Sequence, residues 1–311
     1  MGLSGAGRGA VAGAPERPDL GRPLAAFGWM LGAIVSFVIM AVAGREVQAE
    51  LNTFQLMAWR SAIGLAIVCA ALSLSRPGLA QIRTSHPWLH VQRNVFHFAG
   101  QNAWFLALTL LPLAQLVALE FTSPIWVALL AALMLGERLT PRRIAAVILG
   151  FIGVLIVARP GVEPLQIGHA VALLAALGFA LNTIYTKRIM AHDTVLCVLF
   201  WMTLSQGVMG LLLGLPGGFP MPSAALWPWL VLVGVTGLSA HYCLTSALGH
   251  APASIVAPME FLRLPVIALV GALVYAESVA LAVFIGGAVI LTANMINLGV
   301  RLPRRRGGGG G

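Results

Sequence analysis

Charged residues are scarce in this chain: only 9% of its 311 residues are charged, whereas 59% are hydrophobic. A soluble globular domain carries about 25% charged residues, so this composition excludes an ordinary water-exposed surface and indicates a membrane protein. A spanning helix needs roughly 20 apolar residues. Ten such segments can be placed, at about residues 24–44, 53–74, 88–111, 113–135, 142–158, 167–186, 195–214, 226–249, 252–275 and 279–298.

Acidic residues are scarcer than basic ones, 10 against 19, which gives a net charge of +9. The distribution of the basic residues argues against a nucleic-acid partner, because 14 of them fall on one side of the ten-helix arrangement: Arg8, Arg17, Arg22, Arg76, Arg83, Arg138, Arg142, Arg143, Lys187, Arg188, Arg301, Arg304, Arg305 and Arg306. Only Arg45 and Arg159 fall on the other side. By the positive-inside rule, both termini are expected in the cytoplasm.

Cysteine is also rare, and the three present, Cys69, Cys197 and Cys243, all lie in predicted spans. They exclude a disulfide framework and are interpreted as small core residues. Residues 1–23 lack the short apolar core of a signal peptide and are expected to form a disordered tail. Residues 299–311 form a second tail, basic and rich in glycine.

An internal duplication organises the rest of the chain. At a constant offset of 140 residues, six positions of the first half recur in the second: Ala107, Leu108, Pro112, Glu120, Phe121 and Glu137 as Ala247, Leu248, Pro252, Glu260, Phe261 and Glu277. The offset contains five spans, an odd number, so equivalent helices must point in opposite directions. The sequence therefore predicts two inverted five-helix repeats, at residues 24–158 and 167–298, joined by a linker at 159–166.

Five ionisable residues lie well inside predicted spans: Arg60, Arg93, Glu120, Glu260 and Arg263. Each costs roughly 2.5–3.5 kcal/mol at the bilayer centre, so they should face one another or a water-filled cavity. Depth along the helices predicts that Glu120 meets Arg60, and that Glu260 is neutralised by Arg263 or Arg93. Two interpretations stay open: ion pairs that fix helix register, or groups that exchange partners with substrate or a proton.

The segment 88–111 and the residues before it carry a polar stripe with helical spacing: His86, His90, Arg93, His97, Gln101 and Trp104. Such a stripe indicates a cavity wall. A metal site is not expected, because the stripe offers no cysteine or carboxylate. At the repeat offset, His241 and Tyr242 supply matching hydrogen-bonding groups. Pro124 and Pro265 follow the two glutamates within their spans and are expected to kink those helices.

These features together resemble the drug/metabolite transporter superfamily, in a form with two EamA-type repeats. The resemblance covers about residues 25–298 and rests on the ten spans, the duplication, Gly136-Glu137-Arg138-Leu139, the Gly150 and Gly153 pattern, and the run PLAQLVALEFTSPIW beginning at Pro112. Similar proteins move amino acids, S-adenosylmethionine, riboflavin or amines. The second half departs from the pattern at Ala276, which precedes Glu277 in place of glycine, and at Arg263-Leu264-Pro265.

The sequence thus predicts an inner-membrane secondary transporter, not an enzyme, that moves a small polar or zwitterionic metabolite by alternating access. The predicted substrate-binding residues are Arg60, Arg93, His97, Gln101, Trp104, Glu120, His241, Tyr242, Glu260 and Arg263. No cofactor is expected. A proton is a candidate coupling ion because buried carboxylates titrate near neutral pH, and a homodimer is compatible with the sequence. Two alternatives remain: an intramembrane enzyme that uses the histidines of segment 88–111, and a passive channel.

Overall fold

The computed structural model describes residues 23–76, 78–135, 140–159, 164–251, 256 and 259–298. Within these ranges every regular element is helical, as the sequence predicts. The long helices are α1 (Pro23–Val47), α2 (Thr53–Leu74), α3 (Pro87–Leu110), α4 (Leu113–Glu120), α5 (Ser123–Leu135), α6 (Pro141–Ala158), α7 (Ile167–Ile189), α8 (Val195–Gly214), α9 (Trp227–His250), α11 (Arg263–Tyr275) and α12 (Leu281–Leu298). Two short 3₁₀ helices, η1 (Gly78–Ile82) and η2 (Leu215–Gly217), lie in connections.

Eight helical segments in the described ranges are long and apolar enough to cross a membrane. Helix α3 is not among them because its polar stripe lowers its hydropathy, and α11, with 13 residues, is too short on its own. The chain is therefore a multi-span membrane protein. The Gly136–Leu139 motif, Pro252 and both predicted tails lie outside the described residues.

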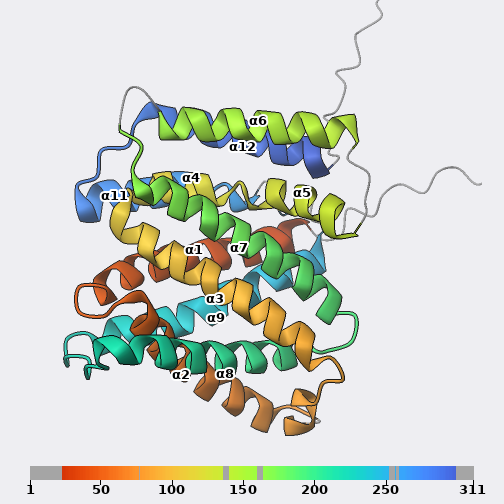
Figure 1. Cartoon of the computed structure of the whole chain (residues 1–311), viewed down its shortest axis with the longest axis vertical. Helices are drawn as coiled ribbons and strands as arrows, with labels where there is room; N and C mark the ends of the chain where they lie inside the picture. Colours follow the sequence, from red (N-terminus) through yellow and green to blue (C-terminus); the bar gives the residue numbers. More distant parts are fainter. Residues whose placement is uncertain are drawn as a thin grey trace, which may run out of the picture.

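Helices from the two halves pack against each other in a reciprocal pattern. Helix α1 packs along α9 and α3 along α7, while α2 pairs with α8 and α6 with α12. Figure 1 shows the α6–α12 pair at one end of the molecule and the α2–α8 pair at the other, with α1, α3, α7 and α9 between them. If α1 is exchanged with α7, α2 with α8 and α3 with α9, the same set of pairs results. This is expected for a duplicated chain.

Two of these pairs depend on glycine because the backbones touch. A Cβ on Gly178 of α7 would lie 2.7 Å from the Cα of Gly100 on α3. A Cβ on Gly286 of α12 would lie 2.8 Å from the carbonyl oxygen of Gly153 on α6. Small residues at helix interfaces allow such close approach in membranes, so the Gly153 position of the sequence pattern has a packing role.

The segment expected as one helix over residues 113–135 is two helices, because α4 ends at Glu120 and α5 begins at Ser123. The matching residues of the second half, Phe261 and Leu262, also form a turn before α11. The amide of Asn294 on α12 donates to the carbonyl of Phe121 over 2.8 Å. An irregular backbone within a membrane is stable only when its polar groups are satisfied by other parts of the protein, and Asn294 does this at the α4–α5 break.

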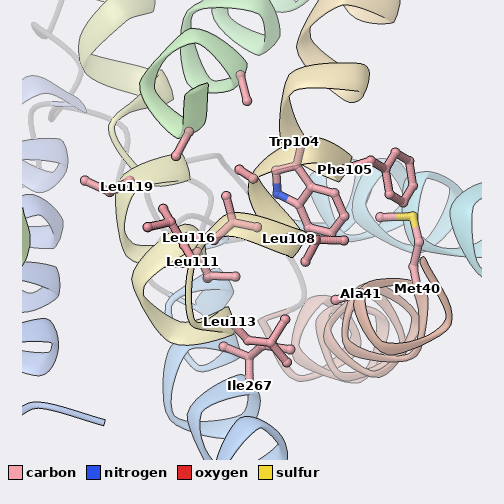
Figure 2. Close-up of a cluster of buried hydrophobic side chains, with 14 of the residues drawn as sticks. Met40, Ala41, Trp104, Phe105, Leu108, Leu111, Leu113, Leu116, Leu119 and Ile267 are labelled. Atoms are coloured by element: carbon pink, nitrogen blue, oxygen red, sulfur yellow. The ribbon is translucent and has the colours of Figure 1, made fainter. Parts of the chain in front are cut away.

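The apolar core includes residues on both sides of this break, such as Leu119 and Ile125. Figure 2 shows Met40 and Ala41 of α1, Trp104, Phe105 and Leu108 of α3, Leu113 and Leu116 of α4, and Ile267 of α11 gathered beside one another. All eight side chains are buried. Close packing of this kind leaves little freedom for the polar groups that project from the same helices.

Candidate functional site

The first part of the site is an ion pair at the two helix breaks. Glu120, the last residue of α4, accepts a hydrogen bond from the guanidinium of Arg263 over 2.8 Å and another from the indole of Trp104 over 2.8 Å. Glu260 lies 3.9 Å from Arg263. The sequence prediction that Glu120 meets Arg60 is therefore wrong. Arg263 begins α11, directly after the irregular residues of the second half, and lies beside the irregular residues that follow Glu120. Two carboxylates thus share one arginine.

Aromatic rings enclose the guanidinium of Arg263. The Cζ atom of Arg263 lies 4.7 Å from the ring centroid of Phe37 and 4.9 Å from that of Phe121. The side chain is 2% exposed, and its Nε has no hydrogen-bond partner among the described residues. Cation–π contacts of this kind stabilise a desolvated guanidinium by about 2 kcal/mol, which supplements the two carboxylates.

The second part of the site is Arg60 of α2, which is buried and has no carboxylate within 4 Å among the described residues. Its Nη1 donates to the amide oxygen of Gln101 over 2.8 Å. A Cβ on Gly237 of α9 would lie 2.7 Å from Nη2 of Arg60, so glycine at 237 makes room for the guanidinium. A cavity of about 10 Å³ lies beside Arg60, which is enough for one water molecule.

Arg93 of α3 is also buried. Its Nη1 donates to the side chain of Asn94 over 2.9 Å and its Nε to Thr186 of α7 over 3.2 Å. Neither Arg60 nor Arg93 has a carboxylate within 4 Å in the part of the chain that the structure describes. The partners that the structure describes for these two buried cations are neutral, and holding a buried cation in this way is costly in a low dielectric.

Two histidines lie with these arginines. The rings of His97 and His241 are 5.8 Å apart, centroid to centroid, in an edge-to-face arrangement. His97 Nδ1 is 2.9 Å from the amide nitrogen of Gln206 on α8. The cluster formed by Arg60, His97, Gln101, Gln206 and His241 thus takes residues from α2, α3, α8 and α9. It joins the two halves, and the matched positions Gln101 and His241 both contribute to it.

Some predicted residues lie elsewhere. Tyr242 is 60% exposed and packs edge-to-face on Trp29, because one residue along a helix turns the side chain about 100° away from the direction of His241. Pro124 and Pro265 lie in the first turns of α5 and α11. Proline is tolerated in a first turn because no intrahelical donor is lost there, and the irregular residues precede the prolines.

An apolar groove adjoins the cluster around Arg60. It has a volume of about 280 Å³, runs between α2 and α8, and is lined by residues that include Trp59, Leu65, Leu211 and Phe219. The indole nitrogen of Trp59 is buried and has no partner among the described atoms. The groove and the small cavity beside Arg60 share Ser61 and Thr203 as lining residues. The polar cavity beside Arg60 therefore borders the groove that contains Trp59 and Phe219.

A third polar group closes one end of the bundle. Arg45, near the end of α1, forms an ion pair with Glu277 and donates to the carbonyls of Leu108 and Leu111 at the end of α3, over 2.8 and 2.9 Å. Glu277 also accepts from the backbone N–H of Leu113 at the start of α4, over 2.9 Å. We call Arg45 and Glu277 the latch, because this pair ties α1 and the end of α11 to the α3–α4 turn.

The sequence interpretation missed Gln206, Asn294 and the partner of Glu277. Gln206 and Asn294 are amide side chains in strongly apolar helices, and an amide within such a helix was the signal that could have found them. The recurrence of Glu137 as Glu277 pointed to a matched role, but the partner Arg45 comes from a distant helix end that no local pattern links to it.

Known proteins match this chain over nearly the whole of its helical part. The model of the EamA-like transporter family matches residues 24–159 and 166–299. A riboflavin transporter of Rhizobium johnstonii is 31% identical over 278 residues, which is 89% of this chain and 92% of that protein. A riboflavin transporter of Brucella anthropi is 32% identical over 74% of this chain and 83% of its own length. An S-adenosylmethionine uptake transporter of Rickettsia felis is 24% identical over 88% of this chain and 92% of its own.

A solved crystal structure shares the fold, with a TM-score of 0.59 and 21% identity over 87% of this chain and 95% of the other. The two family matches together cover nearly all of the chain. The three relatives are transporters, and the similarity covers most of the length of each. The chain belongs to the EamA-like transporter family and is a membrane transporter rather than an enzyme.

Proposed function

We propose that this protein is an inner-membrane secondary transporter of a small polar metabolite, working by alternating access, and that the site around Arg60 and Arg93 binds the substrate. The observation that carries the proposal is the burial of these two arginines without a carboxylate partner among the described residues. A bound group rich in hydrogen-bond acceptors, or an anionic one, supplies what the guanidinium groups lack.

The proposed topology has ten crossings, arranged as two inverted repeats at residues 24–158 and 167–298, with both termini in the cytoplasm. In this topology α4 and α5 together form one crossing, and α11 completes another. The reciprocal helix pairs α1–α9 and α3–α7 support the repeat. The uneven distribution of arginines supports the orientation.

Alternating access requires a state in which the site is closed to one side of the membrane. With room for about one water beside Arg60, and with the latch joined, we assign this conformation to a state closed on the outer side. Release of the latch frees the ends of α1 and α11 from the α3–α4 turn. A passive channel would need a continuous polar path, and the cavity beside Arg60, with room for about one water, argues against one.

Riboflavin is the first substrate to test. Its ring has an apolar edge and an edge of carbonyl and nitrogen acceptors, and its ribityl chain carries hydroxyl groups. The aromatic-lined groove accommodates the apolar edge, the unpartnered indole of Trp59 donates to an acceptor, and Arg60 and Gln206 reach the polar part. Two relatives at 31% and 32% identity carry that activity in their names.

A zwitterion of the S-adenosylmethionine type is the second candidate. Glu120 and Glu260 share the single charge of Arg263, so this part of the site has an excess of negative charge. The arginine pair has an excess of positive charge. A substrate with a carboxylate and a cationic centre would match both. Glu260, whose side chain is 29% exposed, is also the group that we propose to carry a coupling proton.

The test is uptake into proteoliposomes that contain the purified protein. Labelled riboflavin and labelled S-adenosylmethionine are compared, with and without a proton gradient. We expect saturable uptake of one of them, lost in Arg60→Gln and retained in Arg83→Gln, a matched control because Arg83 is exposed in the connection before α3. Equal uptake by Arg60→Gln and wild type would contradict the proposed site.

A further inference from the structure

A second cluster of chemically active side chains lies about one helical turn before Arg93, where the beginning of α3 meets the turn between α7 and α8. His90 of α3, Asp193 of the turn and Cys197 of α8 bring their ligand atoms within 4.8 Å of one another. Nitrogen, carboxylate oxygen and thiol sulfur are the three donor types of protein zinc sites. The segment 88–111 lacks a carboxylate and a cysteine of its own, and the second half supplies both.

The contacts within this cluster leave it only partly satisfied. One ring nitrogen of His90, Nε2, is 2.8 Å from the carboxylate of Asp193, and Thr84 donates to the same oxygen over 2.7 Å. The other ring nitrogen, Nδ1, is buried and has no partner among the described residues. His90 is 1% exposed and Cys197 is fully buried. An unpaired buried polar atom costs free energy. A ligand that binds the imidazole would therefore supply the partner that it lacks.

A further pair of imidazoles adjoins the cluster. The rings of His86 and His192 stack at 4.2 Å beside it. His192 is exposed, so the cluster can be reached from the solvent and has a further imidazole near its entrance.

We propose that His90, Asp193 and Cys197 bind a transition-metal ion of the Zn²⁺ class, with a histidine at the entrance or a water as fourth ligand. A soft sulfur donor and an imidazole favour Zn²⁺ over Mg²⁺ or Ca²⁺, which prefer all-oxygen sites. Binding replaces the thiol proton of Cys197 with the metal, and the proton passes to solvent. The ion links α3 of the first half to the α7–α8 turn of the second, at the opposite end of α3 from the latch.

Cobalt is the probe, because Co²⁺ replaces Zn²⁺ in such sites and gives a thiolate charge-transfer absorption. The full-length protein, with any polyhistidine tag removed, is titrated with Co²⁺ and then with Zn²⁺. We expect one equivalent of Co²⁺ with the thiolate band, displacement of the Co²⁺ by Zn²⁺, and no competition from Mg²⁺. The His90→Gln and Asp193→Asn variants should bind at least about tenfold more weakly.

Cysteine variants distinguish this site from adventitious binding. Cys197→Ser should abolish the thiolate band, whereas Cys243→Ser, which removes a half-buried cysteine of α9, should leave it unchanged. If Cys197→Ser does not fold, the Cys69→Ser/Cys243→Ser protein, in which Cys197 is the one remaining thiol, must keep the band. Absence of the band in the wild type, or its loss in that double variant, would overturn the proposal and leave a hydrogen-bonded tie without metal.

Discussion

Glu120 and Arg263 form a 2.8 Å ion pair that joins the helix breaks of the two halves. The pair lies where the irregular backbone of each half exposes polar groups, and Glu260 stands beside it at 3.9 Å from the same arginine. Since the guanidinium is buried between the rings of Phe37 and Phe121, it cannot find water if a carboxylate is lost. The charge balance at this point is therefore sensitive to each of the two glutamates.

Replacement of Glu120 should destabilise the protein. In Glu120→Gln the guanidinium of Arg263 keeps only the more distant Glu260, and breaking one partner of a buried pair costs about 3–5 kcal/mol. We expect a lower midpoint of thermal unfolding in detergent. Glu50→Gln is the control, because Glu50 is exposed and bonds the Ser223 hydroxyl at the surface. A Glu120→Gln/Arg263→Gln protein should recover part of the loss, and strict additivity of the two changes would argue against direct coupling.

The position of the Arg60 guanidinium can be tested without removing its charge. In Gly237→Ala the new Cβ would lie 2.7 Å from Nη2 of Arg60, which forces the guanidinium away from its place. Transport should fall about 10- to 100-fold, because hydrogen bonds to charged groups contribute about 1.5–3 kcal/mol.

Gly28→Ala is the matched control for that measurement, since no atom lies within 4 Å of a Cβ at that glycine. Initial rates of uptake are compared at equal amounts of folded protein in the vesicles. Normal uptake by Gly237→Ala would mean that the guanidinium can move without consequence, which the proposed site does not allow.

The latch predicts a change in accessibility at the end of α3. In Glu277→Gln, Arg45 loses its carboxylate and the N–H of Leu113 loses a charged acceptor. In a background without the three native cysteines, a cysteine introduced at Leu113, which is fully buried, should then react faster with a membrane-impermeant thiol reagent added outside. An unchanged rate of labelling, with Glu50→Gln as reference, would contradict a gating role for the latch.

The α3–α7 contact should tolerate no added methyl group. A Cβ on Gly178 meets the backbone of Gly100 at 2.7 Å, and backbone atoms cannot rotate away as a side chain can. Gly178→Ala should lower stability by about 1–3 kcal/mol through overpacking, measured by thermal unfolding against Gly28→Ala. Equal stability of the two variants would show that the helices can separate at no cost.

The helical architecture was predictable from the sequence because apolar segments of spanning length have few alternative structures in a membrane. The partner of Glu120 was not predictable. Position along a helix gives the depth of a residue in the membrane but not the direction in which its side chain points, and both Arg60 and Arg263 lie near the depth of Glu120. The same limit applies to Tyr242, which shares a level with His241 but points outward. Histidine 90 shows a further limit, since its carboxylate and thiol neighbours, Asp193 and Cys197, lie about a hundred residues away.

The break between α4 and α5 illustrates a partial success. Pro124 indicated an interruption of the segment 113–135, and the irregular residues lie just before it, at Phe121 and Thr122. What stabilises the break could not be foreseen, since it depends on Asn294 of the last helix reaching the Phe121 carbonyl. Local rules describe where backbone groups are freed, and only the packed structure tells which side chains satisfy them.

A metabolite site at Arg60 and Arg93 is tested most directly by uptake of labelled riboflavin and S-adenosylmethionine into proteoliposomes that contain wild type, Arg60→Gln, Arg93→Gln or Arg83→Gln. We expect wild type and Arg83→Gln to accumulate one of the two substrates in a saturable manner. Arg60→Gln and Arg93→Gln should lose this uptake while they remain folded. Uptake in all four proteins at the same rate, or uptake of neither substrate by the wild type, would contradict a metabolite site built on the two buried arginines.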